Sequence, residues 1–496
     1  MKKIVLLCII IVAAICMLQC IDQSGNTGGN TPQDSTVVTP LPFPDPKIPG
    51  FKFPEDSTTI NKWLDTYDSS DIALHGWGIW AGLTTRTGNK IDSEDLYVFQ
   101  TWETPSDLQD SLNLGGHANR VALTAPQNTR KALRAPKQLE HSEKATNIFM
   151  LKQRSMPANK TPLKVVCYPA KKEGVYTDFD AVAYDNPAAD HILSYRLYDS
   201  SVLAKMYSGG KTDIPDFPNT AIATKPRYYV VHKADIKAGF FPLRIWNGPN
   251  YCKKGFPQKE WPGLVYIDVN NKSAGDGSTG MNDAPQKPAY SYNLNTFIYY
   301  TIKASDTAAI HAAGDPNVTP GDLAILVGMH VTSREIKRWT WQTYWWTPNP
   351  NQPPAPSSAF IVSKRPAQIT GAAAHYAMAV AYTFIWPNQP YTGGNNKGES
   401  IIAFNPFLES AFGTGTFGGD TGLVISKSGP QYNIVGCQTN CMSCHALAIF
   451  TSTAPINNQP GNYIPDTYID MVTNSNFKGA LKLDFLWSIQ ASLLPK

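Results

Sequence analysis

Two apolar runs separated by a short charged segment constrain the fold of this chain more than any other feature. Residues 323–331 are almost continuously apolar, and residues 339–346 contain four tryptophans. Runs of this length and composition are typical of buried strands, and the charged residues 333–338 between them favour a turn. The sequence therefore predicts an antiparallel hairpin with a heavy aromatic wall.

Shorter aromatic and β-branched runs, bounded by glycine, aspartate and serine, predict further strands. These runs cover residues 73–83, 96–102, 164–168, 227–231 and 264–269. Apolar residues at helical spacing predict one helix within residues 188–207 and a closing helix over residues 477–489. We therefore expect an α+β protein with a mainly β scaffold and a partly helical C-terminal segment.

The composition bounds the domain organisation and the partners. The chain has 496 residues, of which 17% are charged, and its net charge is only +4. That length allows two or three domains, or one large domain with insertions. Because the net charge is small and no tract of lysine and arginine is present, we expect no nucleic-acid partner.

The N-terminus has the layout of an export signal. Lys2 and Lys3 precede an apolar run over residues 4–18, which is shorter than the roughly 20 residues that span a bilayer. The run leads to Cys20 and resembles bacterial lipoprotein signals, in which the cysteine is lipidated. Gln19 departs from that pattern, so cleavage elsewhere and an uncleaved anchor stay open. We expect a protein of the periplasm or cell surface, attached to a bacterial membrane by a lipid at Cys20.

These patterns divide the chain into four parts. Residues 1–20 form the signal, and residues 21–50, rich in proline, serine and threonine, are expected to be a disordered tether. A β-rich domain is expected over residues 51–395. Residues 396–496 form a C-terminal segment that carries the main chemical motif.

Three residues in that segment carry the clearest chemical signal. Cys441, Cys444 and His445 stand at positions i, i+3 and i+4, so one helical turn places them on one face. This C-x-x-C-H spacing attaches a c-type haem: two thiols form thioethers with the porphyrin edge, and the imidazole binds the iron. Export agrees with this interpretation, because bacteria attach c-type haem outside the cytoplasmic membrane.

Residues 439–445 resemble the haem-binding segment of c-type cytochromes. More loosely, an aromatic hairpin followed by a C-terminal C-x-x-C-H is similar to large single-haem exported proteins. The resemblance implies one covalent haem c on Cys441 and Cys444, with His445 as an axial iron ligand. It also implies that His445 bonds to a carbonyl beside a proline, for which residues 454–455 are the candidate. The chain departs from small cytochromes in its size and in lacking an obvious helix ahead of the motif.

The second axial ligand of such a haem is less constrained. Small cytochromes c use a downstream methionine, and Met471 is the only methionine after the motif. The alternatives are an open position, or a residue of an apolar run that could line a haem pocket. Those residues are Met329, His330, His375 and Met378. For each of them a place in the core is the simpler interpretation.

The cysteine cluster has three other interpretations. With Cys437, the motif also fits the C-x-x-x-C-x-x-C pattern of radical enzymes that hold a four-iron cluster, although those enzymes carry it early in a barrel. A zinc site needs four separated ligands, which the neighbours Cys444 and His445 do not readily supply. The third interpretation is a disulfide with an incidental histidine. Elsewhere, Cys167 and Cys252 are candidates for a disulfide, which leaves Cys437 over.

The sequence thus predicts an exported electron carrier that exchanges electrons with redox partner proteins. The alternative is a haem-containing periplasmic oxidoreductase with its substrate site in the β-rich region. A third class is a surface binding protein without haem. Motifs of serine hydrolases, zinc proteases and phosphate-binding loops are absent from the sequence, so no separate catalytic residues are predicted.

Overall fold

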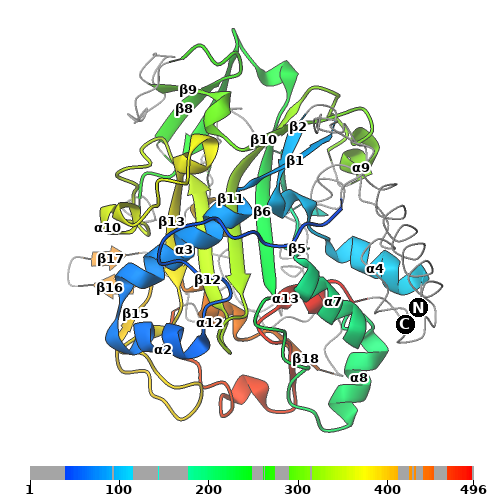
Figure 1. Ribbon diagram of the computed structural model, residues 1–496, viewed down its shortest axis with the longest axis vertical. Helices are drawn as coiled ribbons and strands as arrows, with labels where there is room; N and C mark the ends of the chain where they lie inside the picture. Colours follow the sequence, from blue (N-terminus) through cyan, green and yellow to red (C-terminus); the bar gives the residue numbers. More distant parts are fainter. Residues whose placement is uncertain are drawn as a thin grey trace, which may run out of the picture.

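The computed structural model describes residues 39–91, 94–114, 143–144, 177–248, 258, 261, 263–273, 290–312, 315–410, 424–426, 429–431, 439–451 and 466–493. The centre of this part is an antiparallel sheet of eight strands (Figure 1). Its long strands are β6 (Ile222–Val231), β11 (Leu323–Ser333), β12 (Thr340–Trp346) and β13 (Tyr376–Ala381). The order is β13, β12, β11, β6, β4 (Thr177–Asp180) and β3 (Glu143–Lys144), with β10 (Tyr299–Thr301) beside β11 and β5 (Ala183–Tyr184) beside β6.

The predicted hairpin lies in the middle of this sheet. β11 and β12 pair in antiparallel register, from Ser333 opposite Thr340 to Gly328 opposite Trp345. The charged residues lie in the turn between them, which ends at Trp339 with a φ of 59°. The hairpin is therefore confirmed. The strands predicted over residues 227–231 and 264–269 are also confirmed, in β6 and in β8 (Gly263–Asp268).

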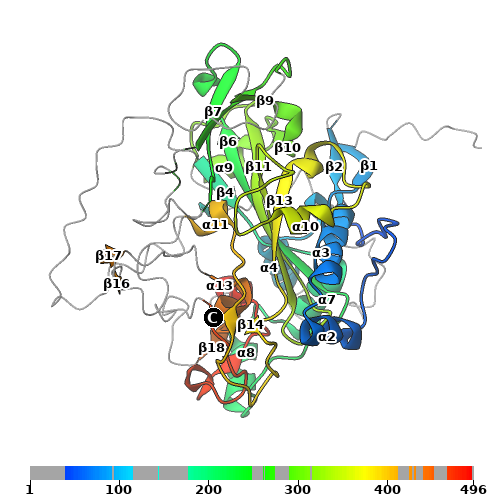
Figure 2. The ribbon, with the colours of Figure 1, turned by 90° about the vertical axis from the view of Figure 1, so that its left-hand side faces the viewer.

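The two faces of the hairpin contact different parts of the chain. Tyr344 stacks on Trp80 of α3 (Ser69–Leu83), with ring centroids 4.4 Å apart. The preceding residue, Thr343, points the opposite way, because side chains alternate along a strand, and it accepts a hydrogen bond from Asn405. Helix α3 thus covers one face, and α11 (Pro406–Glu409) lies on the other (Figure 2).

Helix α3 corrects one sequence prediction. Residues 73–83 are expected to form a strand, but they form most of this helix, which Asp68 caps at its N-terminus. The glycines that suggest strand boundaries are sites of close packing instead. A Cβ on Gly78 would lie only 2.0 Å from the ring of Phe51. Glycine occurs here because a neighbouring segment approaches the helix backbone, not because the helix ends.

Two other predicted elements differ in part from the structure. The strand expected over residues 96–102 ends at Tyr97 and continues as the 3-10 turn η1 (Val98–Thr101). The helix expected within residues 188–207 is two helices, α7 (Asn186–Tyr195) and α8 (Ser200–Ser208). They separate at Arg196, which has a left-handed φ of 51°. The strand predicted over residues 164–168 lies outside the described residues.

The closing helix predicted over residues 477–489 is wrong. Asp484 and Phe485 adopt φ values of 45° and 68°, which an α-helix does not accept. Only the short α13 (Trp487–Ala491) is helical here, after the two-residue strand β19 (Leu481–Lys482). The apolar residues are buried as their spacing suggests, but from an irregular backbone.

The chain packs against the body of the protein before residue 51. Trp102 Nε1 donates to the carbonyl of Leu41 at 2.8 Å, and Leu41 N donates to Thr101 Oγ1 at 3.0 Å. Within the stretch expected as a tether, over residues 21–50, Leu41 is thus hydrogen-bonded to the body of the protein and Ile48 is buried. Residues 1–38, with the expected signal and Cys20, lie outside the described part of the chain.

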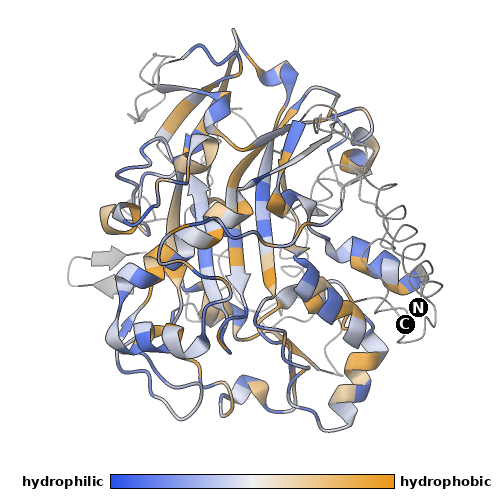
Figure 3. Cartoon of the chain, viewed as in Figure 1, coloured by the Kyte–Doolittle hydropathy of each residue, from blue (hydrophilic) through white to orange (hydrophobic). Residues whose placement is uncertain are grey.

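The larger of two hydrophobic clusters in the described residues joins segments from much of the chain. It contains residues from Ile48 to Leu493, so residues on both sides of the expected boundary at 395 share it. The central strands also carry hydrophilic residues (Figure 3). The combination of helices with antiparallel sheets confirms the α+β class. Within the described residues, none of the helices has the length and apolar character needed to cross a membrane.

Smaller elements surround the central sheet. The other strands are β1 (Arg86–Ile91) with β2 (Glu94–Tyr97), β7 (Phe240–Ile245) with β8 and β9 (Ser291–Asn293), β14 (Ile385–Trp386) with β15 (Glu399–Ser400), β16 (Val424–Ser426) with β17 (Gly429–Gln431), and β18 (Ile449–Phe450) with β19. The other helices are α2 (Ser57–Thr66), α4 (Pro105–Leu114), α9 (Thr307–Ala312), α10 (Ala359–Ser363) and α12 (Cys441–His445), and the other 3-10 turns are η5 (Lys233–Asp235), η9 (Leu294–Thr296), η10 (Gly371–His375) and η11 (Ser475–Phe477).

Candidate functional site

Helix α12 consists of the five residues of the C-x-x-C-H motif. Asn440 starts it, because its side-chain oxygen accepts hydrogen bonds from Met442 N at 2.8 Å and Ser443 N at 3.2 Å. The side-chain amide of Asn440 also donates to three backbone carbonyls, including that of Ile401 at 2.8 Å. One buried side chain therefore both begins the helix and fixes it to the neighbouring chain.

The two cysteines of α12 are free thiols. Cys441 is buried and donates to the carbonyl of Ala403 at 3.2 Å, whereas Cys444 is partly buried. Burial raises the pKa of Cys444 to about 12, and burial followed by the nearby Glu409 carboxylate raises the pKa of Cys441 well above its usual value. Both side chains are therefore neutral thiols at neutral pH, one helical turn apart.

His445 makes one hydrogen bond that fixes its tautomer. Its Nδ1 lies 2.8 Å from the carbonyl oxygen of Phe485. Because a carbonyl only accepts, Nδ1 carries the proton, and Nε2 keeps its lone pair. Burial lowers the pKa of His445 to about 3, against the opposing effect of the Phe485 bond. His445 is therefore a neutral imidazole at physiological pH, the form that binds metals.

A buried ion pair holds the carbonyl that bonds to His445. Asp484, which precedes Phe485, accepts from Arg334 Nε at 2.9 Å and from Phe217 N at 3.2 Å. Both side chains of the ion pair are less than a tenth exposed. Arg334 belongs to the turn between β11 and β12, so the hairpin holds the Phe485 carbonyl through Asp484.

The aromatic wall of the hairpin also reaches α12. The ring of Trp341 lies against the imidazole of His445, with centroids 4.2 Å apart and planes tilted by 40°. The indole nitrogen of Trp341 donates to the carbonyl of Arg338 at 3.1 Å, which fixes the ring. His445 is thus confined by an aromatic face and by a hydrogen bond at Nδ1.

A second group of polar residues lies beside Cys441. His330 Nε2 is 3.1 Å from Glu409 Oε1, and one ligand atom of each of His330, Glu409 and Cys441 lies within 4.8 Å of the others. Glu409 also accepts from Asn405 N at 2.8 Å, whereas His330 Nδ1 has no partner among the described residues. A nitrogen, an oxygen and a sulfur this close together are a candidate set of metal ligands.

The other candidate iron ligands lie in different places. Met329 and Met378 both pair with Tyr344 across the sheet, so they point toward α3 and away from α12. His375 lies at the end of η10, where burial lowers its pKa. Met471 is buried and lines a small cavity with Ala446, Ala448 and Phe485.

The structure therefore brings three of the predicted residues into one turn and places His330 beside them. The predicted partner of His445 at residues 454–455 lies outside the described residues, as do Cys167, Cys252 and Cys437. Sequence reasoning missed Phe485, Asp484, Arg334 and Glu409. A backbone carbonyl leaves no sequence signal, and Asp484 and Arg334 are 150 positions apart.

Comparisons with known proteins do not identify a family for this chain. No protein-family model matches the chain, and neither the curated proteins nor the solved structures include a match.

Proposed function

We propose that the chain binds one haem c covalently and transfers electrons between redox partner proteins. Cys441 and Cys444 would form the thioether bonds, and His445 would be an axial ligand of the iron. The observation that carries the proposal is the hydrogen bond from His445 Nδ1 to Phe485 O, made from the same turn that presents two free thiols. This bond leaves Nε2 as the ligand atom.

The residues around α12 fit such a group in their chemistry. The haem, when bound, supplies a one-electron iron couple. The chain's own residues hold the axial histidine: Phe485 O keeps the proton on Nδ1, and Trp341 fixes the ring plane. A carbonyl partner also raises the basicity of a ligating imidazole. His445 is partly buried, and its contacts with Trp341 and Phe485 favour a defined orientation of the ring.

Two residues are proposed as the second axial ligand. Met471 is the choice from the sequence, and it is buried near α12. His330 is supported by its unpartnered Nδ1 and its place beside Cys441. The spin state of the haem in two variants, read from the absorption spectrum, distinguishes the two choices. Replacing the true ligand by leucine, as Met471→Leu or His330→Leu, is expected to turn a low-spin haem into a high-spin haem, while the other replacement leaves it low-spin.

Haem attachment can be tested directly on the full chain, produced in a bacterium that matures c-type cytochromes. A haem-stained denaturing gel and a reduced-minus-oxidised spectrum are expected to show covalent haem in the native chain. The double variant Cys441→Ala/Cys444→Ala is expected to lose it, and the control Cys252→Ala is expected to keep it. Covalent haem in the double variant, or none in the native chain, would contradict the proposal.

Elemental analysis of the same purified chain distinguishes haem from a metal ion bound at Cys441. A thioether at Cys441 removes the thiolate that a site with His330 and Glu409 would use. Elemental analysis of the purified chain is therefore expected to find about one iron, all of it in haem, and no stoichiometric zinc or copper. A stoichiometric metal without haem would favour the His330–Glu409–Cys441 set instead.

The alternative function is a haem-containing periplasmic oxidoreductase. A polar groove beside the turn between β11 and β12 favours it, because that turn also positions Trp341 against His445. An electron carrier is expected to be low-spin and inert to carbon monoxide and peroxide. A high-spin haem that binds both would favour the oxidoreductase.

Export and lipid attachment remain part of the proposal. The support is the sequence of residues 1–20, with the charged start, the apolar run and Cys20. Mass spectrometry of the N-terminal peptide from membranes is expected to find Cys20 as the first residue with attached acyl chains. An unmodified N-terminus at Met1 would contradict it.

A further inference from the structure

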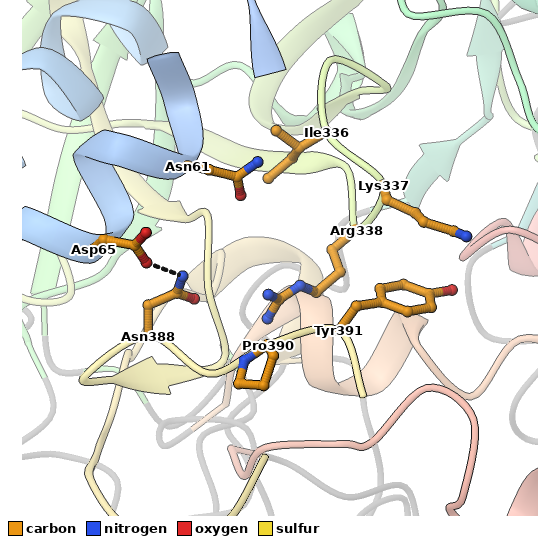
Figure 4. Close-up of a pocket in the computed structure, with 8 residues that line it drawn as sticks. All are labelled: Asn61, Asp65, Ile336, Lys337, Arg338, Asn388, Pro390 and Tyr391. Carbon is orange, nitrogen blue, oxygen red and sulfur yellow. Dashed lines mark hydrogen bonds between the residues drawn. The ribbon is translucent and has the colours of Figure 1, made fainter. Parts of the chain in front are cut away.

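A groove lies between α2 and the turn that joins β11 to β12 (Figure 4). Its volume is about 430 Å³, which is enough for a small organic molecule. Asn61 and Asp65 reach it from α2, and Ile336, Lys337 and Arg338 line it from the turn. The segment that follows β14 closes its floor with Asn388 and Tyr391. Helix α12 contributes no side chain to the lining of this groove.

Arg338 is the feature that points to a ligand. The side chain is only 7% exposed, yet its guanidinium has one donor, Nη2, bound to the carbonyl of Gln389 at 2.6 Å. Its other terminal nitrogen, Nη1, has no partner among the residues that the structure describes. A guanidinium stays charged under all physiological conditions. Burying a cation with an unused hydrogen-bond donor costs free energy unless an anion pairs with that cation.

A neighbouring arginine in the same turn shows the contrast. Arg334 is equally buried, and it pairs with Asp484 at 2.9 Å and with Asp216 at 3.3 Å. Arg338 has no such pair in the described chain, and Asp65, the acid that lines the groove, accepts instead from Asn388 Nδ2 at 2.9 Å. The turn therefore pairs one arginine with two carboxylates. Among the described residues the other has no carboxylate in ion-pair contact, and its guanidinium lies 5.5 Å from the centre of the Phe384 ring.

The remaining lining residues select among anions. Lys337 adds a second positive charge at the exposed rim, with its Nζ 4.8 Å from the centre of the Tyr391 ring. Asp65 places a negative charge on the wall formed by α2. It repels a doubly charged anion about twice as strongly as a singly charged one, and its oxygens can accept hydrogen bonds from hydroxyl groups. The ring of Tyr391 and the side chain of Ile336 offer apolar surface for C–H groups.

We propose that this groove binds a small hydroxylated carboxylate, such as a sugar acid, with its carboxylate on Arg338 and its hydroxyl groups toward Asp65 and Asn61. The planar guanidinium suits the two oxygens of a carboxylate. The proposal does not depend on the haem, since every contact it uses belongs to α2, the hairpin turn and residues 388–391.

The test is calorimetric titration of the full chain with D-glucuronate, and with D-glucose and inorganic phosphate as comparison ligands. Glucuronate is expected to bind saturably, at least roughly tenfold more tightly than glucose or phosphate, since a charge-assisted hydrogen bond is worth about that much. The haem-free Cys441→Ala/Cys444→Ala chain is expected to bind it equally well. That arm separates this proposal from the proposed haem.

Three variants identify the residues. Arg338→Gln is expected to weaken glucuronate binding at least roughly tenfold. Because Arg338 is buried, Asn61→Asp serves as a second variant: it is exposed, and its added charge is expected to weaken binding without unfolding the chain. Lys62→Gln, an exposed neighbour on α2 that does not line the groove, is expected to bind as the native chain does.

Each other result overturns the proposal. It fails if glucuronate does not bind, if glucose or phosphate binds as tightly, or if Asn61→Asp leaves the affinity unchanged in a chain with native thermal stability.

Discussion

His445 has a different role for each of its two ring nitrogens. Nδ1 donates to Phe485 O, and Nε2 keeps the lone pair that a metal needs. The wrong tautomer would place the proton on Nε2 and leave the buried carbonyl without its donor. The folded chain therefore already holds His445 in the tautomer that the proposed haem would need.

The burial of His445 predicts how stability depends on pH. Its pKa falls to about 3 in the folded chain, from an ordinary value of about 6.5 in the unfolded chain. As the pH falls through that window, the unfolded chain takes up a proton that the folded chain does not. The free energy of unfolding contributed by this residue is therefore complete above about pH 6.5 and is lost toward pH 3.

We expect His445→Gln to reduce this pH dependence. One proton corresponds to a slope of about 1.4 kcal/mol per pH unit. The measurement is urea unfolding at several values between about pH 4 and pH 6.5. It uses the haem-free Cys441→Ala/Cys444→Ala chain with and without the substitution, so that no ligand competes. Equal slopes in the two proteins would show that His445 takes up its proton over the same pH range in the folded and unfolded chains, which would contradict the lowered pKa.

At the scale of elements, α12 depends on its cap. A five-residue helix has too few internal hydrogen bonds to be stable by itself. Asn440 supplies an acceptor to the helix and donors to three carbonyls, from a fully buried position. The start of the helix that carries both thiols and His445 is therefore fixed by this one side chain, while Phe485 and Trp341 hold the ring of His445.

Asn440→Ala is expected to destabilise the chain by about 2–4 kcal/mol, from the lost cap and the unsatisfied carbonyls. Asn440→Ser keeps an oxygen for the cap but loses the donors, so a smaller loss is expected. Urea unfolding measures both values. Haem attachment, measured on a stained gel, is expected to fall in the same order. The interpretation of Asn440 as the anchor is wrong if both variants unfold like the native chain.

The elements also show which predictions a sequence supports. The hairpin over residues 323–346 was predictable, because few structures other than a buried hairpin accommodate two long apolar runs with charges between them. Residues 73–83 were not, because glycine signals a strand boundary and a close helix contact equally well. Residues 477–489 show the same limit: the apolar spacing reports burial, but the left-handed residues Asp484 and Phe485 break the helix.

The candidate site also has one part that the sequence predicts and one part that it does not. The spacing of Cys441, Cys444 and His445 is local, so one helical turn follows from it. The partners of that turn come from positions that are distant in the sequence, such as Phe485, which is 40 residues from His445. Such contacts depend on the tertiary fold, and a carbonyl partner could be supplied by any residue type.

At the scale of the whole molecule, the shared core predicts that the chain does not divide at residue 395. Residues from α12 and from 481–493 are buried against the same core as the central sheet. A fragment that ends at residue 395 would expose that surface to water. We expect it to show no cooperative thermal transition by circular dichroism, whereas the full chain unfolds cooperatively. A cooperative transition in the fragment would establish an independent β-rich domain.

The turn between β11 and β12 has a consequence for how this chain tolerates changes in length. Surface loops usually accept an added residue, because little depends on their position. Here Arg334 anchors Asp484 beside the carbonyl that holds His445, Arg338 lines the groove, and the Arg338 carbonyl positions Trp341. An insertion between Arg334 and Arg338 would shift the register of these contacts together, so this short turn works as a spacer of fixed length.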